Sequence, residues 1–211
     1  MRNSSKNKFY LNVAMFACIT SALLCIATLI INLIMGTNSL TANSIFTGCW
    51  NAIFYLIVGN YYYRSRDYKG RAFQATLILA ICTFIIPSIV NLVFGLIYGG
   101  ISGLLSTLYI LAISLCAGIV YSIALILFSR RQSRGRYIFL FITGIILFVT
   151  YILSFGNDLY VYIKLLIDIF QNISSYTELD VAVVILQLLN SVVSIAFGFV
   201  YFYTPIYLKR N

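Results

Sequence analysis

Histidine is absent from this 211-residue chain, and charged residues make up only 9% of it. An ordinary soluble domain carries roughly 25% charged residues. A chain that is 62% hydrophobic, with a mean hydropathy of +0.98, cannot be solvated as a globule. The composition therefore indicates an integral membrane protein, with room for roughly five to seven helices that cross a bilayer.

The missing residue types also restrict the chemistry. No Asp or Glu lies inside any predicted span, and no Cys-x-x-Cys pair occurs among the five cysteines. Paired nucleophiles and bases, thiolate metal sites and proton relays all need such groups. We therefore predict no enzyme activity, no catalytic residue, no metal site, no cofactor and no proton coupling. The cysteines lie in apolar runs, which predicts small buried side chains at Cys18, Cys25, Cys49, Cys82 and Cys116.

Long apolar runs predict an all-α membrane bundle of six spans in a single domain, arranged as three helical hairpins. The apolar stretch 159–170 is too short to cross a bilayer, which predicts a helix in the outer interface. Pro87 should kink the third span and free the carbonyl of Thr83 four residues earlier. The predicted spans are 9–35, 45–63, 72–98, 101–128, 137–155 and 181–207.

Two basic islands mark the turns between the hairpins. Apart from Lys164, every base lies in one of these islands or near a chain end. Because basic residues concentrate in cytoplasmic loops, the sequence predicts a cell-membrane protein with both termini in the cytoplasm. Topology thus explains the net charge of +9, and we predict no nucleic-acid partner. The islands contain Arg64, Arg66, Lys69 and Arg71, and then Arg130, Arg131, Arg134 and Arg136.

A shift of 65 residues superimposes the first island on the second. Arg66 then falls on Arg131, and Arg71 falls on Arg136. Two explanations stay open. One is a duplicated hairpin, since internal repeats are common in transporters. The other is independent selection of Arg, Lys and Gly in short inner turns.

Uncharged polar residues within the spans are the candidate functional groups. In the last span they recur every three or four residues and therefore share one helix face. Amides in hydrocarbon must find partners. They either bond between helices or line a site for a small neutral or aromatic ligand. The candidate lining residues are Gln187, Asn190, Ser194, Asn91 and Asn51.

Two families share this general plan. In size, six spans and cytoplasmic termini, the chain is similar to the substrate-binding subunits of energy-coupling-factor vitamin transporters. Those often dock their transducing subunit through an Ala-x-x-x-Ala motif, where this chain has Cys18-x-x-x-Ala22 and Ser21-x-x-x-Cys25. Three hairpins with basic inner turns also resemble the small acid-resistance membrane proteins of enteric bacteria. Neither resemblance rests on a specific motif, so neither assigns a family.

The sequence thus favours a multi-pass small-molecule permease or substrate-binding membrane subunit. The alternative is a non-transporting membrane protein for interaction, assembly or stress response. We expect the lipid bilayer as a partner, together with an ATPase or other membrane subunit, or a second copy of the chain. A polar cavity reaching the middle of the membrane would favour the first hypothesis, and a closed core would favour the second.

Overall fold

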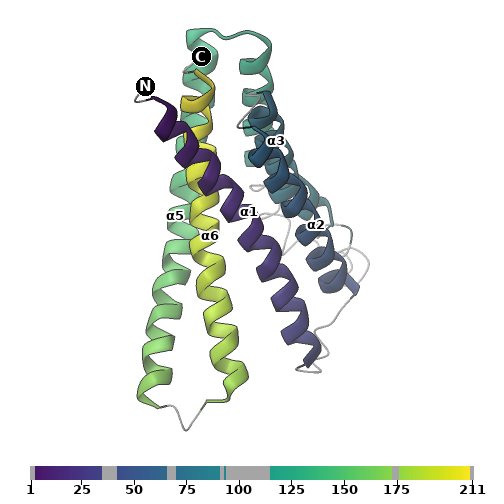
Figure 1. Ribbon diagram of the computed structural model, residues 1–211, viewed down its shortest axis with the longest axis vertical. Coiled ribbons are helices and arrows are strands. Elements are labelled where there is room, and N and C mark those ends of the chain that lie inside the picture. The colour runs from purple at the N-terminus through teal and green to yellow at the C-terminus, as the bar shows by residue number, and fades with distance from the viewer. Residues whose placement is uncertain are drawn as a thin grey trace.

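The computed structural model describes residues 3–34, 42–65, 70–90, 93, 115–172 and 176–209. Within these ranges the chain forms helices and short connections, without a strand. The helices run up and down along the long axis of the molecule (Figure 1). In chain order they are α1 (Asn3–Ile34), α2 (Ala42–Arg64), α3 (Gly70–Ala80), the π-helical turn η1 (Ile81–Ile85), a helix over Leu115–Arg130, α5 (Arg134–Gln171) and α6 (Glu178–Lys209).

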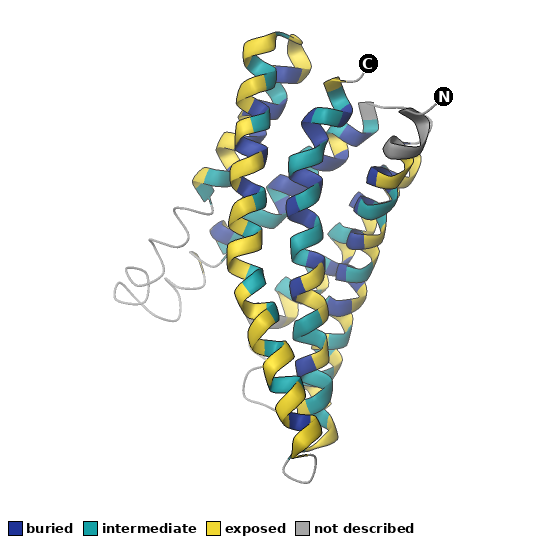
Figure 2. Cartoon of the chain, turned by 90° about the vertical axis from the view of Figure 1, so that its left-hand side faces the viewer, coloured by how far each residue is buried: buried dark blue, intermediate teal, exposed yellow. Residues whose placement is uncertain are grey.

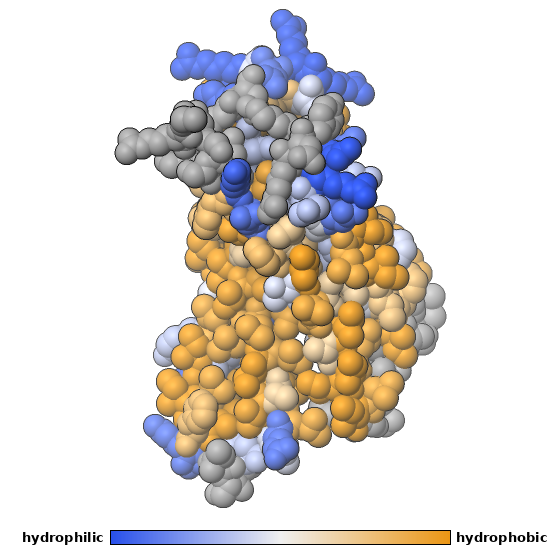
Figure 3. All heavy atoms as spheres, viewed as in Figure 1, coloured by the Kyte–Doolittle hydropathy of each residue, from blue (hydrophilic) through white to orange (hydrophobic). Residues whose placement is uncertain are grey.

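Four described stretches are long and apolar enough to cross a membrane, which is the architecture of a membrane-embedded, multi-pass protein. Figure 3 shows the corresponding hydrophobic belt between two hydrophilic ends. The helix over 115–130 is apolar but shorter, and α2 is not among the four. The four stretches are Lys8–Ile34, Arg71–Val90, Arg134–Gln171 and Glu178–Lys209.

The predicted helices agree with the described ones for most of the chain. The spans expected at 45–63, 137–155 and 181–207 each fall within one described helix, and the span expected at 9–35 agrees with α1 up to Ile34. The spans expected at 72–98 and 101–128 extend beyond the described residues. The count of six spans therefore stays a prediction.

Residues 159–170 do not form the separate interfacial helix that the sequence predicts. They continue α5 without a break to Gln171, so α5 has 38 residues. At about 1.5 Å per residue it is about 57 Å long, against about 30 Å for the hydrocarbon core. Gly156 costs a helix only about 1 kcal/mol, and Ile169, buried near the helix end, helps to offset that cost.

Two of the three predicted hairpins are formed by helices that pack along each other. α1 packs on α2, where a Cβ added at Gly59 would lie 3.3 Å from the Cβ of Cys18. α5 packs on α6, where a Cβ added at Gly198 would lie 2.8 Å from the Cβ of Tyr151. α6 also packs on α1 and α3, so the last helix joins both hairpins to the third described segment.

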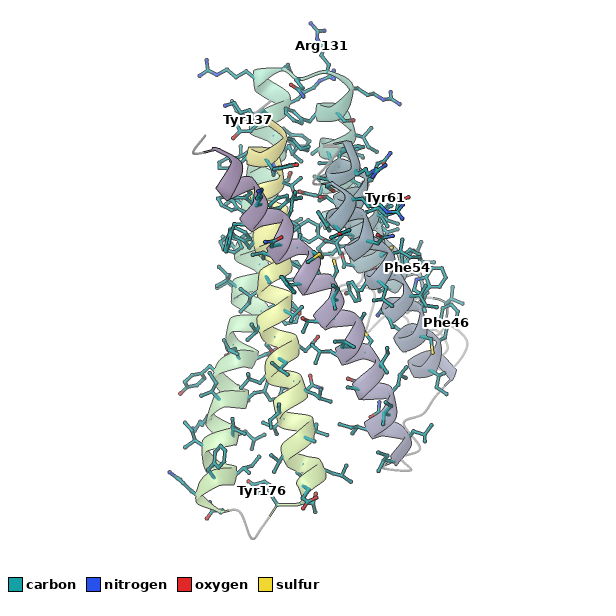
Figure 4. The ribbon with its side chains drawn as sticks, viewed as in Figure 1. Phe46, Phe54, Tyr61, Arg131, Tyr137 and Tyr176 are labelled. Atoms are coloured by element: carbon teal, nitrogen blue, oxygen red, sulfur yellow. The ribbon has the colours of Figure 1, made fainter. Side chains whose placement is uncertain are left out.

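The two ends of the molecule differ in character. The ends of α1 and α6 that carry the chain termini lie beside Arg131, whereas Tyr176 lies at the opposite end (Figures 1 and 4). There the Asp168 carboxylate accepts hydrogen bonds from Asn172 Nδ2 (3.0 Å) and the Tyr176 hydroxyl (2.6 Å). This bond to the carboxylate raises the pKa of Tyr176. We call the Arg131 end the basic end.

The cysteine prediction is confirmed only in part. Cys18 and Cys82 are buried, and Cys25 is half-buried. Cys49 and Cys116 are exposed on the helix surfaces, where a small apolar thiol can face lipid as readily as protein. All five cysteines are free thiols.

Candidate functional site

Four tyrosines have no exposed surface and come from four different helices: Tyr10, Tyr62, Tyr121 and Tyr201. Each lies within about three turns of the helix end that points to the basic end. Figure 2 shows that buried residues concentrate in this half of the bundle. Because a phenol hydroxyl in an apolar core is costly without a hydrogen bond, each of these side chains should have a partner.

The first branch of this network joins α1, α2, α3 and α6. The Tyr10 hydroxyl lies 2.7 Å from Thr204 Oγ1, and the Tyr62 hydroxyl lies 2.7 Å from Thr76 Oγ1. The two threonine oxygens are 3.4 Å apart. The rings of Tyr10 and Tyr62 meet edge to face, with centroids 6.2 Å apart. Side chains from four helices are thus tied together in one buried cluster.

Counting hydrogens fixes the direction of these bonds. Thr204 Oγ1 donates to the Val200 carbonyl (2.7 Å), and Thr76 Oγ1 donates to the Ala72 carbonyl (2.9 Å). A threonine hydroxyl has a single hydrogen. The tyrosine hydroxyls are therefore the donors to the threonines. Each threonine hydrogen is thus already used in a bond to a backbone carbonyl of its own helix. Neither threonine can donate to the other unless it breaks that bond.

The second branch joins η1, α6 and the helix over 115–130. Thr83 Oγ1 donates to the Leu79 carbonyl (2.8 Å), so the Tyr201 hydroxyl donates to Thr83 Oγ1 (2.7 Å). The Tyr121 hydroxyl donates to the backbone carbonyl of Tyr201 (3.0 Å). The rings of Tyr121 and Tyr201 also meet edge to face, with centroids 5.1 Å apart. Tyr201 is therefore held through both its side chain and its backbone.

Pro205 explains why the Tyr201 carbonyl needs this side-chain donor. Proline has no N–H, so the carbonyl four residues earlier loses its helical hydrogen bond. Tyr121 supplies the missing donor from another helix. The same carbonyl lies only 2.9 Å from where a Cβ at Gly144 would be, so α5 can come this close only with glycine there. Two neighbouring helices thus pack on the carbonyl that Pro205 leaves without a helical hydrogen bond, and one of them supplies the donor.

A second irregularity lies opposite, at η1. The N–H of Ile86 donates to the carbonyl of Ile81, five residues earlier, which widens the helix directly before Pro87. The kink predicted at Pro87 accordingly takes the form of a π-helical turn. Ser88 Oγ donates to the Phe84 carbonyl (2.6 Å), which gives that carbonyl a side-chain donor beside the proline.

The two irregular segments meet at Tyr201. Thr83 and Phe84 both belong to η1, and they contact Tyr201 through a hydrogen bond and through rings whose centroids are 5.6 Å apart. A bent segment of one predicted hairpin therefore packs on the proline break of another. We call this contact the Tyr201 junction.

The predicted polar residues of α6 share the face of Tyr201. Gln187, Asn190, Ser194, Phe197 and Tyr201 recur at spacings of three or four residues, which places them along one side of the helix. Phe197 and Tyr201 are buried, Ser194 and Gln187 are half-buried, and Asn190 is exposed. This face is closed at the Tyr201 junction and becomes more open with distance from the basic end.

Asn51 of α2 is half-buried and lies one turn from a contact with α6. Tyr55 stacks on Phe197 with ring centroids 5.4 Å apart, and both helices run toward the basic end. Asn51 precedes Tyr55 by one turn, and Ser194 precedes Phe197 by three residues. The two polar residues therefore each lie about one turn from a ring contact between α2 and α6. Beside Asn51, the indole N–H of Trp50 is buried, and no described residue accepts its hydrogen bond.

The described bases of the two islands lie at the basic end, where two of them cap helices. Arg71 Nη1 donates to the Arg64 carbonyl at the end of α2 (3.5 Å), and Arg136 Nη1 donates to the Leu127 carbonyl (2.9 Å). Cations near helix C-termini are favourable because they complement the last carbonyls and the helix dipole. Arg64, Arg130, Arg131 and Arg134 are exposed, while Arg66, Lys69 and Asn91 lie outside the described residues.

The buried hydroxyl network is the feature that the sequence patterns did not indicate. Tyrosines at the end of a span typically lie at the headgroup level, as the exposed Tyr63 can, but Tyr62 beside it is fully buried. One signal was available. Tyr201 precedes Pro205 by four residues, which marks a carbonyl that needs a donor from elsewhere.

Within the described ranges, no three His, Cys, Asp or Glu side chains come together as metal ligands would. The site therefore consists of hydroxyl, amide and aromatic groups. No protein-family model, curated protein or solved structure matches the chain.

Proposed function

We propose that the chain is a membrane-embedded permease or substrate-binding subunit for a small uncharged molecule. The Tyr201 junction is the observation that supports this most strongly. π-Helical turns recur at functional sites, and transporters often build their substrate sites beside interrupted helices. Here two irregular segments from different hairpins meet through a single side chain, so a small movement of one changes the contacts of the other.

The proposed ligand site lies next to the junction, on the polar face of α6 opposite Asn51. Amides and hydroxyls donate and accept hydrogen bonds without carrying charge. A site that lacks Asp, Glu and His offers no counter-ion to an ionic substrate and no proton relay. The ligand is therefore neutral, and transport is either passive or driven by a partner ATPase. The proposed lining is Gln187, Asn190, Ser194, Asn51 and Asn91.

In the proposed orientation there are six spans in the cell membrane, with both termini in the cytoplasm. The closed tyrosine network then lies toward the cytoplasm, and the polar face of α6 opens toward the outer side. The proposed ligand thus enters from outside and stops above the Tyr201 junction.

Thermal stability of the purified chain with and without neutral solutes tests this site. Glycerol, hexoses and nucleosides are added in turn to the protein in detergent. We expect one of these classes to raise the Tm, since a ligand at 100 times its Kd stabilises by about 2.7 kcal/mol. Asn51→Leu should weaken the binding of that ligand by roughly 2–10-fold, which corresponds to one lost hydrogen bond.

Asn60→Leu is the matched control, because Asn60 is exposed on the same helix. It should leave the response to the solute unchanged. If no solute class shifts the Tm, or if both variants respond alike, the ligand site is rejected in favour of the non-transporting alternative. Swelling of proteoliposomes in the active solute then separates a permease from a binding subunit that needs an ATPase.

A further inference from the structure

We infer that a cavity at the basic end binds the phosphate group of an anionic lipid headgroup. The cavity has a volume of about 500 Å³ and lies where the helix over 115–130, the start of α5 and the end of α6 come together. It is separate from the polar face of α6 and does not depend on the proposed function. Its lining residues are Phe128, Gln132, Ser133, Arg134, Tyr137 and Lys209.

Two lining residues are positively charged and none is acidic. Arg134 is exposed and can present a planar fork of donors, which matches a phosphate group. Lys209 Nζ lies 4.1 Å from the centroid of the Tyr137 ring, so a cation–π contact holds it at the cavity wall. The two charges come from different helices, α5 and α6, and line the same cavity.

The first turn of α5 adds further donors. Ser133 is the N-cap, and its hydroxyl accepts from the N–H of Arg136 (3.3 Å). The N–H groups of Arg134 and Gly135 have no acceptor within the helix, and the positive end of the helix dipole favours an anion there. A Cβ added at Gly135 would meet nothing within 4 Å, so the backbone is open to approach.

Aromatic side chains form the other wall. The rings of Phe128 and Tyr137 have centroids 6.1 Å apart. Charged donors on one side and aromatic rings on the other fit an amphipathic ligand better than a bare ion. Figure 4 places Tyr137 just below Arg131 at the basic end, and aromatic side chains at this level typically sit among headgroups. We therefore assign the cavity to a phosphodiester that is attached to acyl chains.

Native mass spectrometry of the full chain, released from micelles that contain phosphatidylglycerol or phosphatidylcholine, tests this site. The wild-type chain should retain one phosphatidylglycerol in preference to phosphatidylcholine. Each base that lies close to the bound phosphate contributes about fivefold to the binding of an anionic lipid, and salt screens the contribution of exposed bases farther away. Arg134→Gln combined with Lys209→Gln should therefore weaken retention of that lipid by roughly 25-fold. If the double variant fails to fold, the single variant Arg134→Gln replaces it, and its retention of that lipid should be about fivefold weaker than that of the wild type.

Arg130→Gln combined with Arg131→Gln is the matched control. It removes the same charge from exposed residues that do not line the cavity, whose attraction is screened by salt, so retention should change less than about threefold. Equal loss in both double variants would show general surface attraction and overturn the site. Displacement of the lipid by inorganic phosphate at similar concentration would assign the cavity to free phosphate and overturn the lipid assignment.

Discussion

The carbonyl of Tyr201 takes its hydrogen bond from a side chain 80 residues earlier in the chain. Water cannot replace that donor in hydrocarbon. The other buried tyrosines are in a different position, since Thr76 still donates to its own helix when the hydroxyl of Tyr62 is removed. The contribution of each tyrosine hydroxyl to stability therefore depends on whether its removal leaves a buried acceptor without a hydrogen bond.

Tyr121→Phe should lower the free energy of unfolding by about 1–3 kcal/mol, because it leaves a buried carbonyl without a donor. The same substitution should cost much less in a Pro205→Ala background, since the alanine N–H can serve the Tyr201 carbonyl. A double-mutant cycle of SDS-induced unfolding in detergent measures this coupling.

Tyr62→Phe is the comparison for that cycle and should cost roughly 0.6–1.7 kcal/mol, as for other hydrogen bonds between membrane helices. Its cost should not depend on residue 205. If Tyr121→Phe costs the same with proline and with alanine at that position, Tyr121 does not replace the missing N–H.

Among the helices, α5 shows how one element meets two environments. Its first half packs closely on α6, where Gly144 faces the backbone of Tyr201 and Phe202. Farther along, Leu153, Tyr160 and Phe170 are about two-thirds exposed, at 70%, 67% and 70%. Glycine is therefore needed at one point of α5 and is only tolerated at another.

Gly144→Ala should destabilise the protein by about 1–3 kcal/mol, since its Cβ meets backbone that cannot rotate away. Gly156→Ala, in the same helix, meets nothing within 4 Å and should stabilise by up to about 1 kcal/mol through helix propensity. Unfolding of the two variants under identical conditions gives the comparison. A neutral Gly144→Ala would mean that α5 and α6 do not pack as closely as described.

For the whole molecule, charge and hydropathy divide along the long axis. Apart from Lys164, the described bases gather at one end with both chain termini, and a hydrophobic belt separates them from the end that carries Tyr176 (Figures 3 and 4). The positive-inside rule converts this geometry into an orientation. A reporter fused after Asn211 should therefore read as cytoplasmic, and one inserted at residues 173–175 should read as external. An external signal from the first fusion would contradict the six-span arrangement.

The positions of the spans predicted at 9–35, 45–63, 137–155 and 181–207 were predictable because a long apolar run marks each of them. The π-helical turn was anticipated in part, since Pro87 cannot donate a hydrogen bond. The continuity of α5 through Gly156 was not, because polar residues there resemble a turn and only packing on α6 decides otherwise. The tyrosine network was least accessible. Periodicity tells which face Tyr201 occupies, but not that Thr83 and Tyr121 come to meet it.

The bond between Tyr10 and Thr204 joins residues 194 positions apart in the chain. At about 5–20 residues per second, a ribosome needs roughly 10–40 s to pass from the first to the second. For that time the Tyr10 hydroxyl is without its partner, because α6 is made after every other described helix. During synthesis the first hairpin therefore lacks this buried hydrogen bond until α6 enters the membrane and packs on α1.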